Sequence, residues 1–298
     1  MKVVIFGSTG QLGHWLGKTK PTEIEALTPS RREVDFCDGN SVCEYILENE
    51  PDWVINAAAY TNVDAAEKDD VVCSVINSHS PACLAWGTQL TNSKLLHIST
   101  DYIFDGAASS PYKISDTPNP VNHYGYSKLE GEKSITDILD SDLYCILRTS
   151  GLYSHRRSNF FLSIFEKLML NKPFNVVDDQ ITRFTSARAL AEICWRVVLN
   201  DITGTHHYAE TPEMSRFEFA SVIKEKIAEK GIADSLSEIV PVSTKEVPSA
   251  ATRPLYSVLD NTLSRSDFGL ESDVWERNLL HVFYKSAFLG VSDELFPF

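Results

Sequence analysis

The chain has 298 residues, enough for one large core or for two unequal domains. Its 43% hydrophobic and 23% charged residues are typical of an ordinary globular protein. The formal net charge of -14 argues against a surface built to bind nucleic acid, because neutralising phosphates requires a concentrated basic face.

The N-terminal run MKVVIFGSTG is interrupted by Gly7 too soon to be a signal peptide. No run elsewhere approaches the roughly 18 apolar residues that a membrane-spanning helix requires. The sequence therefore predicts a soluble, cytoplasmic protein with no membrane partner.

In the first half, short apolar runs alternate with intervals long enough for crossover helices. We expect buried strands at 3–6, 23–27, 53–59, 94–100 and 144–150. This alternation predicts an α/β fold with a doubly wound parallel sheet and helices on both of its faces.

Beyond Ser150 the pattern changes to amphipathic helices with short strands between them. The helices are expected near 158–171, 186–199, 215–230 and 274–289. We interpret this half as a smaller, mostly helical substrate lobe, with domains at 1–165 and 166–298. Because no linker or low-complexity tract separates them, we expect the two lobes to pack together.

The first strand leads directly into GSTGQLG, in which Gly7, Gly10 and Gly13 precede a helix. Glycine permits a tight turn and a close approach to a pyrophosphate, and the free amides of the helix start attract that anion. The position after a strand and before a helix favours dinucleotide binding over a merely structural glycine turn.

The second strand runs into LTPSRREVDF, where an acidic residue would bind a ribose 2'-hydroxyl and an arginine would suit a 2'-phosphate. Ser30, Arg31 and Arg32 offer donors there, so NADP(H) is favoured. NAD(H) stays open, because two arginines on a loop are commonly only a solvated turn.

In the segment YGYSKLEGE, Tyr124 and Lys128 are four residues apart and share a helical face. A cation beside the phenol favours tyrosinate, so we expect a lowered pKa for Tyr124 and a role in proton transfer. The alternative is an exposed helix with an ordinary tyrosine and lysine. Thr100 ends the fourth strand, where open α/β sheets bind ligands, and with Tyr124, Lys128 and a nicotinamide it would form a carbonyl reduction site.

Several motifs in this order resemble the extended short-chain dehydrogenase/reductases, and more narrowly the dTDP-4-dehydrorhamnose reductase branch. They are the glycine triplet, NAAAYTNVDAAE (56–67), STDYIFDG (99–106), YGYSKLEGE (124–132) and LRTSGLY (147–153). The resemblance implies a Rossmann-like fold and a triad of Thr100, Tyr124 and Lys128. Tyr124 would protonate the sugar C4 oxygen as NADPH delivers hydride to C4, while Lys128 would hold the nicotinamide ribose and Thr100 would orient the carbonyl.

The resemblance implies further contacts. The positions matching the cofactor site of the family are Gln11, Leu12, Asp35, Phe36, Ala57, Ala58 and Ala59. Those matching its substrate pocket are Thr61, Val63, Asp101, Tyr102, Gly151, Asn159, Arg183 and Arg253. Packing is the alternative for the three alanines and for Tyr102, and surface charge is the alternative for the arginines.

Some positions depart from the family. Gly151 stands where Trp is common, and Thr182 and Phe184 replace Gly and Pro in DQITRFT (179–185). Arg183 would compensate through a bidentate contact to the pyrophosphate. Because GHWLGK has no match for the acidic residues of magnesium-linked relatives, and the six cysteines form no metal-binding cluster, we expect no essential metal and reduced, buried thiols.

The leading interpretation is NADPH-dependent reduction of a nucleotide-linked 4-keto-6-deoxyhexose, most specifically dTDP-4-dehydro-L-rhamnose. The alternatives are a UDP- or GDP-linked sugar, a combined epimerase/reductase, and a non-catalytic NADP-binding regulatory protein. A homodimer stays open, and the apolar FLGVSDELFPF at 288–298 is expected to dock on the protein or on a partner chain.

Overall fold

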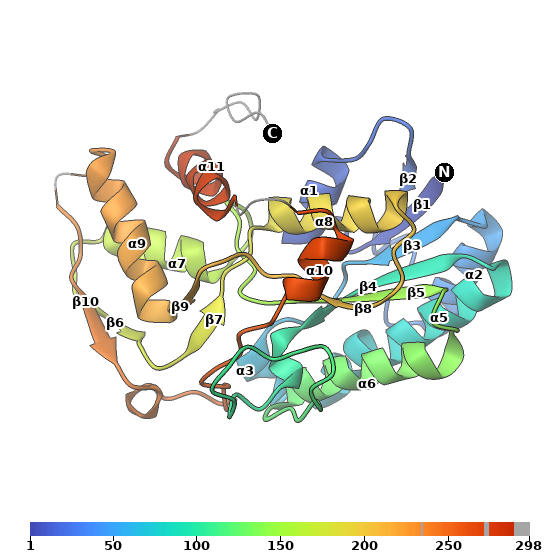
Figure 1. Ribbon diagram of the computed structural model, residues 1–298, viewed down its shortest axis with the longest axis horizontal. Coiled ribbons are helices and arrows are strands. Elements are labelled where there is room, and N and C mark those ends of the chain that lie inside the picture. Colours follow the sequence, from blue (N-terminus) through green and yellow to red (C-terminus); the bar gives the residue numbers. More distant parts are fainter. Residues whose placement is uncertain (234, 271–273, 289–298) are drawn as a thin grey trace.

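The computed structural model describes residues 1–233, 235–270 and 274–288 (Figure 1). Its centre is a six-stranded, wholly parallel sheet in the order β2-β1-β3-β4-β5-β8. The strands are β1 (Lys2–Phe6), β2 (Glu25–Leu27), β3 (Trp53–Asn56), β4 (Lys94–Thr100), β5 (Tyr144–Thr149) and β8 (Gly204–His207). The predicted doubly wound parallel sheet is confirmed.

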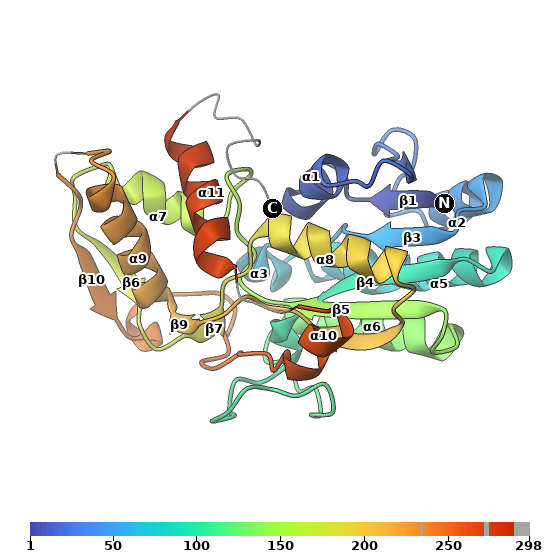
Figure 2. The same cartoon turned by 45° about the horizontal axis from the view of Figure 1, so that its top comes forward.

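Helices cover both faces of the sheet, because its strands are apolar on both sides. Val3 and Ile5 of β1 face α1 (Gln11–Lys18) and α8 (Ala187–Leu199). Val4 and Phe6 of the same strand face the opposite layer. That layer consists of α2 (Gly39–Asn49), α5 (Ser80–Thr91) and α6 (His123–Ile138). Figures 1 and 2 show α1 and α8 on one side of the sheet and α6 on the other.

A short helical segment connects β3 to α5. It contains α3 (Val63–Ala66), α4 (Asp70–Ser74) and a π-helical turn at Val75–His79. The turn places Asn77 so that its side chain accepts from Tyr60 N at 2.9 Å and donates to Tyr60 O at 3.0 Å. These two bonds fix the chain just after β3, which borders the cleft described below.

The second lobe lies at the left of Figure 1 and has two small sheets. In one, β6 (Phe174–Val177) pairs with β10 (Ile239–Val242), and in the other β7 (Ile181–Arg183) pairs with β9 (Glu213–Ser215). Its helices are α7 (Phe160–Leu168), α9 (Arg216–Glu229) and α11 (Trp275–Ala287).

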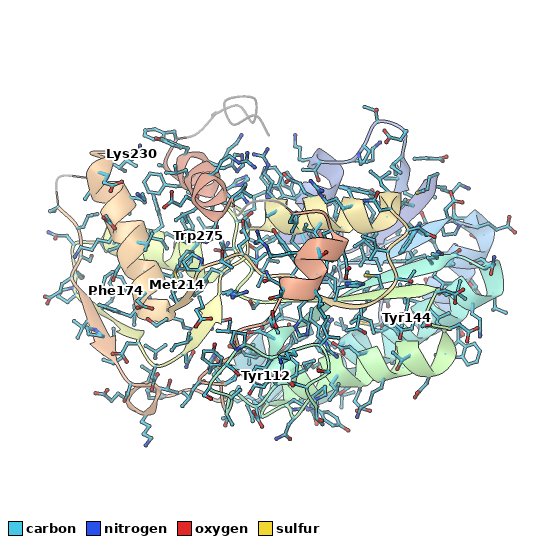
Figure 3. The ribbon with its side chains drawn as sticks, in the orientation of Figure 1. Tyr112, Tyr144, Phe174, Met214, Lys230 and Trp275 are labelled. Carbon is cyan, nitrogen blue, oxygen red and sulfur yellow. The ribbon has the colours of Figure 1, made fainter. Side chains whose placement is uncertain are left out.

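The core of this lobe is rich in aromatic side chains. Phe184 and Phe219 stack with ring centroids 4.0 Å apart, and Met214 and Trp275 belong to the same core (Figure 3). Short 3-10 turns at Asp101–Ile103 and Thr244–Glu246 and the helix α10 (Thr262–Asp267) complete the described elements.

The chain returns to the sheet after the predicted boundary near residue 165. Helix α8 packs on α1, and β8 adds the sixth strand beside β5. Helix α8 and strand β8 therefore belong to the sheet layer, although the predicted boundary at residue 165 placed them in the C-terminal lobe. The four predicted C-terminal helices are present, with short strands between them as expected, but the sequence did not indicate that one of these strands, β8, joins the central sheet.

All six cysteines are free thiols. Cys73, Cys145 and Cys194 are buried, but Cys37 is exposed and Cys43 and Cys83 are partly exposed, so the expectation of buried thiols holds for only three. Across the described ranges, the structure has no helix long and apolar enough to cross a membrane and no group of His, Cys, Asp and Glu that could hold a metal ion. The predicted docking segment lies, apart from Phe288, outside the described residues.

Candidate active site

A cleft of about 480 Å³ opens at the carboxyl ends of the sheet strands. It lies beside the point between β1 and β3 where the strand order reverses, the usual ligand site of doubly wound sheets. Predicted residues that line it are Gly10, Gln11, Leu12, Ala57, Ala58, Ala59, Thr61, Thr100, Asp101, Tyr124, Lys128, Gly151 and Asn159.

The glycine loop forms one wall of this cleft. Gly7 has φ +84°, and a Cβ there would meet the backbone of Ala57 and Ala58 at 2.6 Å. The loop can therefore pass the end of β3 only if residue 7 is a glycine. Helix α1 starts immediately afterwards at Gln11, and its first backbone N–H groups lack intrahelical acceptors. The wall therefore fits the pyrophosphate of a dinucleotide.

The stretch before α7 ties this loop to the second lobe. Ser154 Oγ donates to Gln11 Oε1 at 2.7 Å, and Arg157 Nε donates to Thr9 O at 3.0 Å. Asn159 caps α7 through its Oδ1 and also borders the cleft. Sequence reasoning missed Arg157, because HRRSN carries no periodicity that distinguishes it from surface charge.

Tyr124 and Thr100 meet inside the cleft through a hydrogen bond between their hydroxyl groups. Thr100 Oγ1 also donates to Asp101 Oδ1 at 3.1 Å and accepts from Tyr102 N at 3.2 Å. Asp101 is buried, and its Oδ2 accepts from Ser257 Oγ at 2.5 Å and from Thr182 Oγ1 at 3.3 Å. Burial raises the pKa of Asp101 to about 6.

Lys128 is directed toward the sheet. Its Nζ donates to Ile98 O at 2.6 Å and lies 3.1 Å from His97 Nε2. Burial lowers the pKa of Lys128 to about 8, and burial raises the pKa of Tyr124. The prediction that Lys128 lowers the pKa of Tyr124 is therefore wrong for this structure, because the loss of hydration around the phenol outweighs any nearby positive charge.

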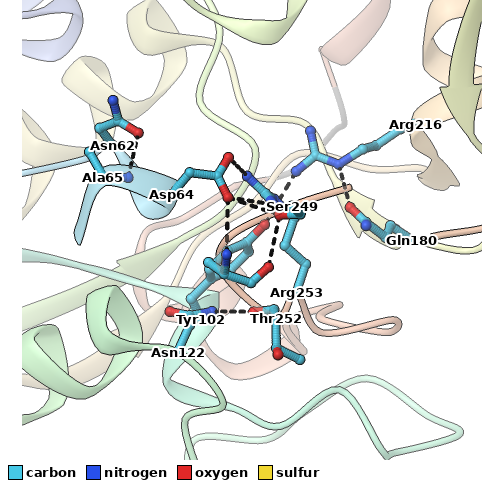
Figure 4. Close-up of polar contacts among 11 residues, drawn as sticks. Asn62, Asp64, Ala65, Tyr102, Asn122, Gln180, Arg216, Ser249, Thr252 and Arg253 are labelled. Atoms are coloured by element: carbon cyan, nitrogen blue, oxygen red, sulfur yellow. Dashed lines mark hydrogen bonds and ion pairs between the residues drawn. The ribbon is translucent and has the colours of Figure 1, made fainter. Parts of the chain in front are cut away.

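A second hollow of about 210 Å³ lies next to Tyr102 and carries two arginines (Figure 4). Arg253 Nη2 pairs with Asp64 Oδ2 at 2.7 Å, and this contact holds the pKa of Asp64 well below its usual range. Arg216 Nε donates to Gln180 Oε1 at 2.9 Å and its Nη2 to Tyr102 Oη at 3.3 Å. The Tyr102 ring in turn packs edge-on against Tyr124, with centroids 5.9 Å apart, so Tyr102 connects the hollow to the cleft.

Arg216 and Gln180 are candidate binding residues that the sequence did not indicate. Arg216 is the first residue of α9, within the capping box of Ser215 and Glu218. That motif predicts a helix start, but only the fold brings it beside Gln180 of the DQITRFT loop.

Other predicted residues lie outside both hollows. Ser30, Arg31, Arg32 and Asp35 are exposed after β2, at the same edge of the sheet, and Phe36 packs on Phe6 at 5.5 Å.

Val63 begins α3 between Thr61 of the cleft and Asp64 of the second hollow, but is not itself among the residues that line either one. Arg183 donates from Nη1 to Leu259 O and Asn261 Oδ1, both at 3.0 Å, so its guanidinium is already engaged away from the cleft.

The departures at Gly151 and Phe184 are linked. Gly151 has φ +54°, and a Cβ there would lie 2.5 Å from Arg183 O and 3.0 Å from Phe184 Cα. Phe184 is buried in the aromatic core of the second lobe, which holds this loop against Gly151. A tryptophan at 151 would therefore need a different path for the 183–184 loop.

Comparisons with known proteins agree with this architecture. Residues 1–287 match the family model described as RmlD substrate binding domain. The dTDP-4-dehydrorhamnose reductase of Burkholderia thailandensis is 32% identical over 92% of this chain and 95% of its own length. The spore coat polysaccharide biosynthesis protein SpsK of Bacillus subtilis is 33% identical over 87% and 89%, respectively.

Among solved structures, dTDP-4-dehydrorhamnose reductase from Bacillus anthracis in complex with NADP superposes with a TM-score of 0.88 at 32% identity. The match covers 95% of this chain and 99% of that one. The chain belongs to the dTDP-4-dehydrorhamnose reductase family, as its motifs predicted.

Proposed function

We propose that this protein reduces the C4 keto group of a nucleotide-linked 4-keto-6-deoxyhexose with NADPH, and that its substrate is dTDP-4-dehydro-L-rhamnose, giving dTDP-L-rhamnose. The observation that carries the proposal is the hydrogen-bonded Thr100–Tyr124 pair, which stands between the glycine loop and the two-arginine hollow. The names of the relatives supply the sugar and the cofactor.

The chemistry needs a proton at the substrate oxygen. NADPH, bound along the glycine loop, would supply the hydride to C4. Tyr124 gives its phenolic proton to the C4 oxygen, and the resulting tyrosinate recovers a proton from solvent. Its raised pKa suits this direction, because the phenol is held in the protonated form until the oxygen acquires charge. Thr100 holds the phenol in place through the hydrogen bond between the two hydroxyl groups.

The second hollow would hold the nucleotide diphosphate. Arg216 and Arg253 present two guanidinium groups, which suit phosphate oxygens in shape and charge. Asp64 offsets the charge of Arg253, so Arg216 supplies the larger net positive charge to an anionic substrate. Arg31 and Arg32, exposed after β2, would contact the 2'-phosphate of NADP(H). A cytoplasmic location and a homodimer remain predictions of the sequence.

Tyr124→Phe tests the assignment. Purified protein is mixed with NADPH and a panel of dTDP-, UDP- and GDP-linked 4-keto-6-deoxyhexoses, with and without a 3,5-epimerase, and nicotinamide absorbance is followed. We expect oxidation with the dTDP sugar and a loss of about 10²–10⁴-fold in kcat for Tyr124→Phe, the range for general acid catalysis. NADPH binding, measured by its fluorescence, should persist.

Tyr126→Phe is the matched control, because Tyr126 lies on the same helix and is 52% exposed. It should keep full turnover. Tight NADPH binding without oxidation of any sugar would instead support the regulatory alternative, and oxidation of a UDP or GDP sugar alone would reassign the nucleotide.

A further inference from the structure

The segment 249–253 contacts both the second hollow and the helix that carries Tyr124. Three of its residues line the hollow, namely Ser249, Ala251 and Arg253. The carbonyl oxygen of Thr252, in the same segment, accepts from Asn122 Nδ2 at 2.9 Å (Figure 4). Asn122 immediately precedes α6, so five consecutive residues connect the site proposed for the diphosphate with the start of the catalytic helix.

Asp64 holds this segment in place. Its Oδ1 accepts from Ser249 Oγ at 2.8 Å and from Ala251 N at 3.1 Å. Arg253 adds a bidentate contact, from Nη1 to Oδ1 at 3.2 Å and from Nη2 to Oδ2 at 2.7 Å. A lone ion pair with a carboxylate that is 46% exposed would stabilise little. Here one carboxylate binds three residues of the segment, so it fixes the path of the backbone.

Helix α3, which carries Asp64, also holds the first turn of α6. Glu67, the C-cap of α3, accepts from His123 N at 2.9 Å through its Oε1. Asn122 Oδ1 accepts from Gly125 N at 2.8 Å and caps α6. The first N–H groups of a helix have no acceptors within it, so these contacts decide where the first turn lies, and Tyr124 with it.

Arg253 has most of its donors engaged within this arrangement. A guanidinium has five N–H groups. Arg253 directs two of them to Asp64 and a third to Ser249 Oγ. A phosphate that binds Arg253 therefore contacts the same side chain that fixes the segment, and its binding cannot be independent of the contacts of Asp64.

We propose that Asp64 is a positioning residue that makes the placement of Tyr124 depend on occupation of the second hollow, by holding the 249–253 segment against α3 and α6. The consequence for turnover rests on the proposed function. Binding energy from a remote part of a substrate raises kcat when it orders the catalytic group. A misplacement of about 1 Å can cost about 10²-fold in rate. The nucleotide diphosphate would thus contribute to turnover as well as to affinity.

Hydrogen–deuterium exchange tests the connection without catalysis. Asp64→Asn should speed exchange in peptides covering 121–126 as well as 249–253, because an amide cannot accept all the bonds that the carboxylate accepts. In the wild type, dTDP should slow exchange in both peptides. A change confined to 249–253 in either experiment would overturn the proposal, since the start of α6 would then not respond to the segment.

Steady-state kinetics separate positioning from simple charge compensation. We expect Asp64→Asn to lower kcat about 10-fold or more and to leave NADPH binding unchanged. If Asp64 only offset the charge of Arg253, the variant would lower KM for the anionic substrate and keep kcat, which would overturn the proposal. Asp69→Asn is the matched control, because Asp69 is exposed on the same stretch of chain and accepts from the Tyr60 hydroxyl instead of the segment.

A double-mutant cycle tests the route through Thr252. Asn122→Ser keeps a side chain that caps a helix and loses the donor to Thr252 O. If both residues act through the 249–253 segment, the double variant with Asp64→Asn should lose about as much kcat as either single variant. Losses that multiply would show two independent effects and would overturn the route.

The outcomes also distinguish this proposal from the proposed function. If a dTDP sugar is reduced but dTDP protects neither peptide, the coupling fails and the reductase stands. If no sugar is reduced but dTDP protects both peptides in the wild type, the coupling stands and the proposed function fails. If Asn122→Ser does not fold, the exchange experiments on the wild type and Asp64→Asn decide the proposal.

Discussion

At the scale of single residues, burial decides the electrostatics of the site. Among the described residues, Asp101 accepts from three hydroxyl groups and has no cation in direct contact, so its carboxylate is stabilised less than in water. The residue types around it could be read from the sequence. Their effect could not, because Thr182 and Ser257 come from segments 81 and 156 residues away.

This environment predicts how Asp101 affects stability with pH. Its pKa is raised to about 6 in the folded protein, above the ordinary 3.8, so the folded state binds more protons between these values. The contribution of Asp101 is therefore fully present below pH 4 and is lost as pH rises through 6. Relative to Asp101→Asn, the wild type should lose about 2–3 kcal/mol of unfolding free energy over this range.

Urea unfolding of both proteins at several pH values between 4 and 7 measures this difference. Asp105→Asn is the control of opposite sign, because hydrogen bonds, first that from Ala107 N, lower the pKa of Asp105. The contribution of Asp105 should be lost as pH falls. A wild-type curve parallel to that of Asp101→Asn would show that Asp101 titrates normally.

At the scale of elements, the sequence predicts what is periodic and misses what is short. The amphipathic pattern predicted α7, α8, α9 and α11 close to their observed bounds. It gave neither the position of β8 nor its place in the central sheet, because GTHH is four residues with two histidines and no apolar run. The strand exists because its backbone completes the edge beside β5, which is a tertiary effect. The second hollow, which contains Arg216, was missed for a similar reason. Neither a residue at a helix start nor a glutamine in a loop indicates a binding site until the fold brings the two together.

The contact between Gly151 and the 183–184 loop gives a prediction at this scale. Gly151→Ala should cost about 1–2 kcal/mol for its left-handed backbone, plus a further penalty for the 2.5 Å approach to Arg183 O. Gly231→Ala isolates the backbone cost, because Gly231 has φ +60° and nothing within 4 Å of a Cβ.

Urea unfolding of the two variants measures the difference between these costs. Equal losses of unfolding free energy would mean that the 183–184 loop yields freely. A larger loss for Gly151→Ala would support the close packing of that loop as the reason why this chain has no tryptophan at 151.

At the scale of the whole molecule, the two lobes share one winding chain. After β5 the chain builds α7, β6 and β7, returns to the sheet for α8 and β8, and then leaves again for β9, α9 and β10. We predict that a chain ending after residue 165 will not fold cooperatively. It would lack α8, whose buried residues cover Val3, Ile5 and Trp15 on one face of the sheet layer.

Circular dichroism and gel filtration of residues 1–165 check this, with residues 1–288 as the control that keeps every described element. The short chain should aggregate or show a broad, non-cooperative transition, whereas the control should unfold in one step. A sharp transition and NADPH binding by residues 1–165 would establish an independent first domain.

The return of the chain to the sheet also limits how substrate specificity can be transferred between relatives by recombination. A substrate lobe encoded as one contiguous stretch could be recombined between two genes with a single crossover. In this chain residues 187–207 interrupt it, so a chimaera that takes the pocket of a relative and keeps this sheet needs several junctions. Substrate preference is therefore expected to diverge within this architecture by local changes such as those at Gly151 and Phe184, rather than by transfer of an intact lobe.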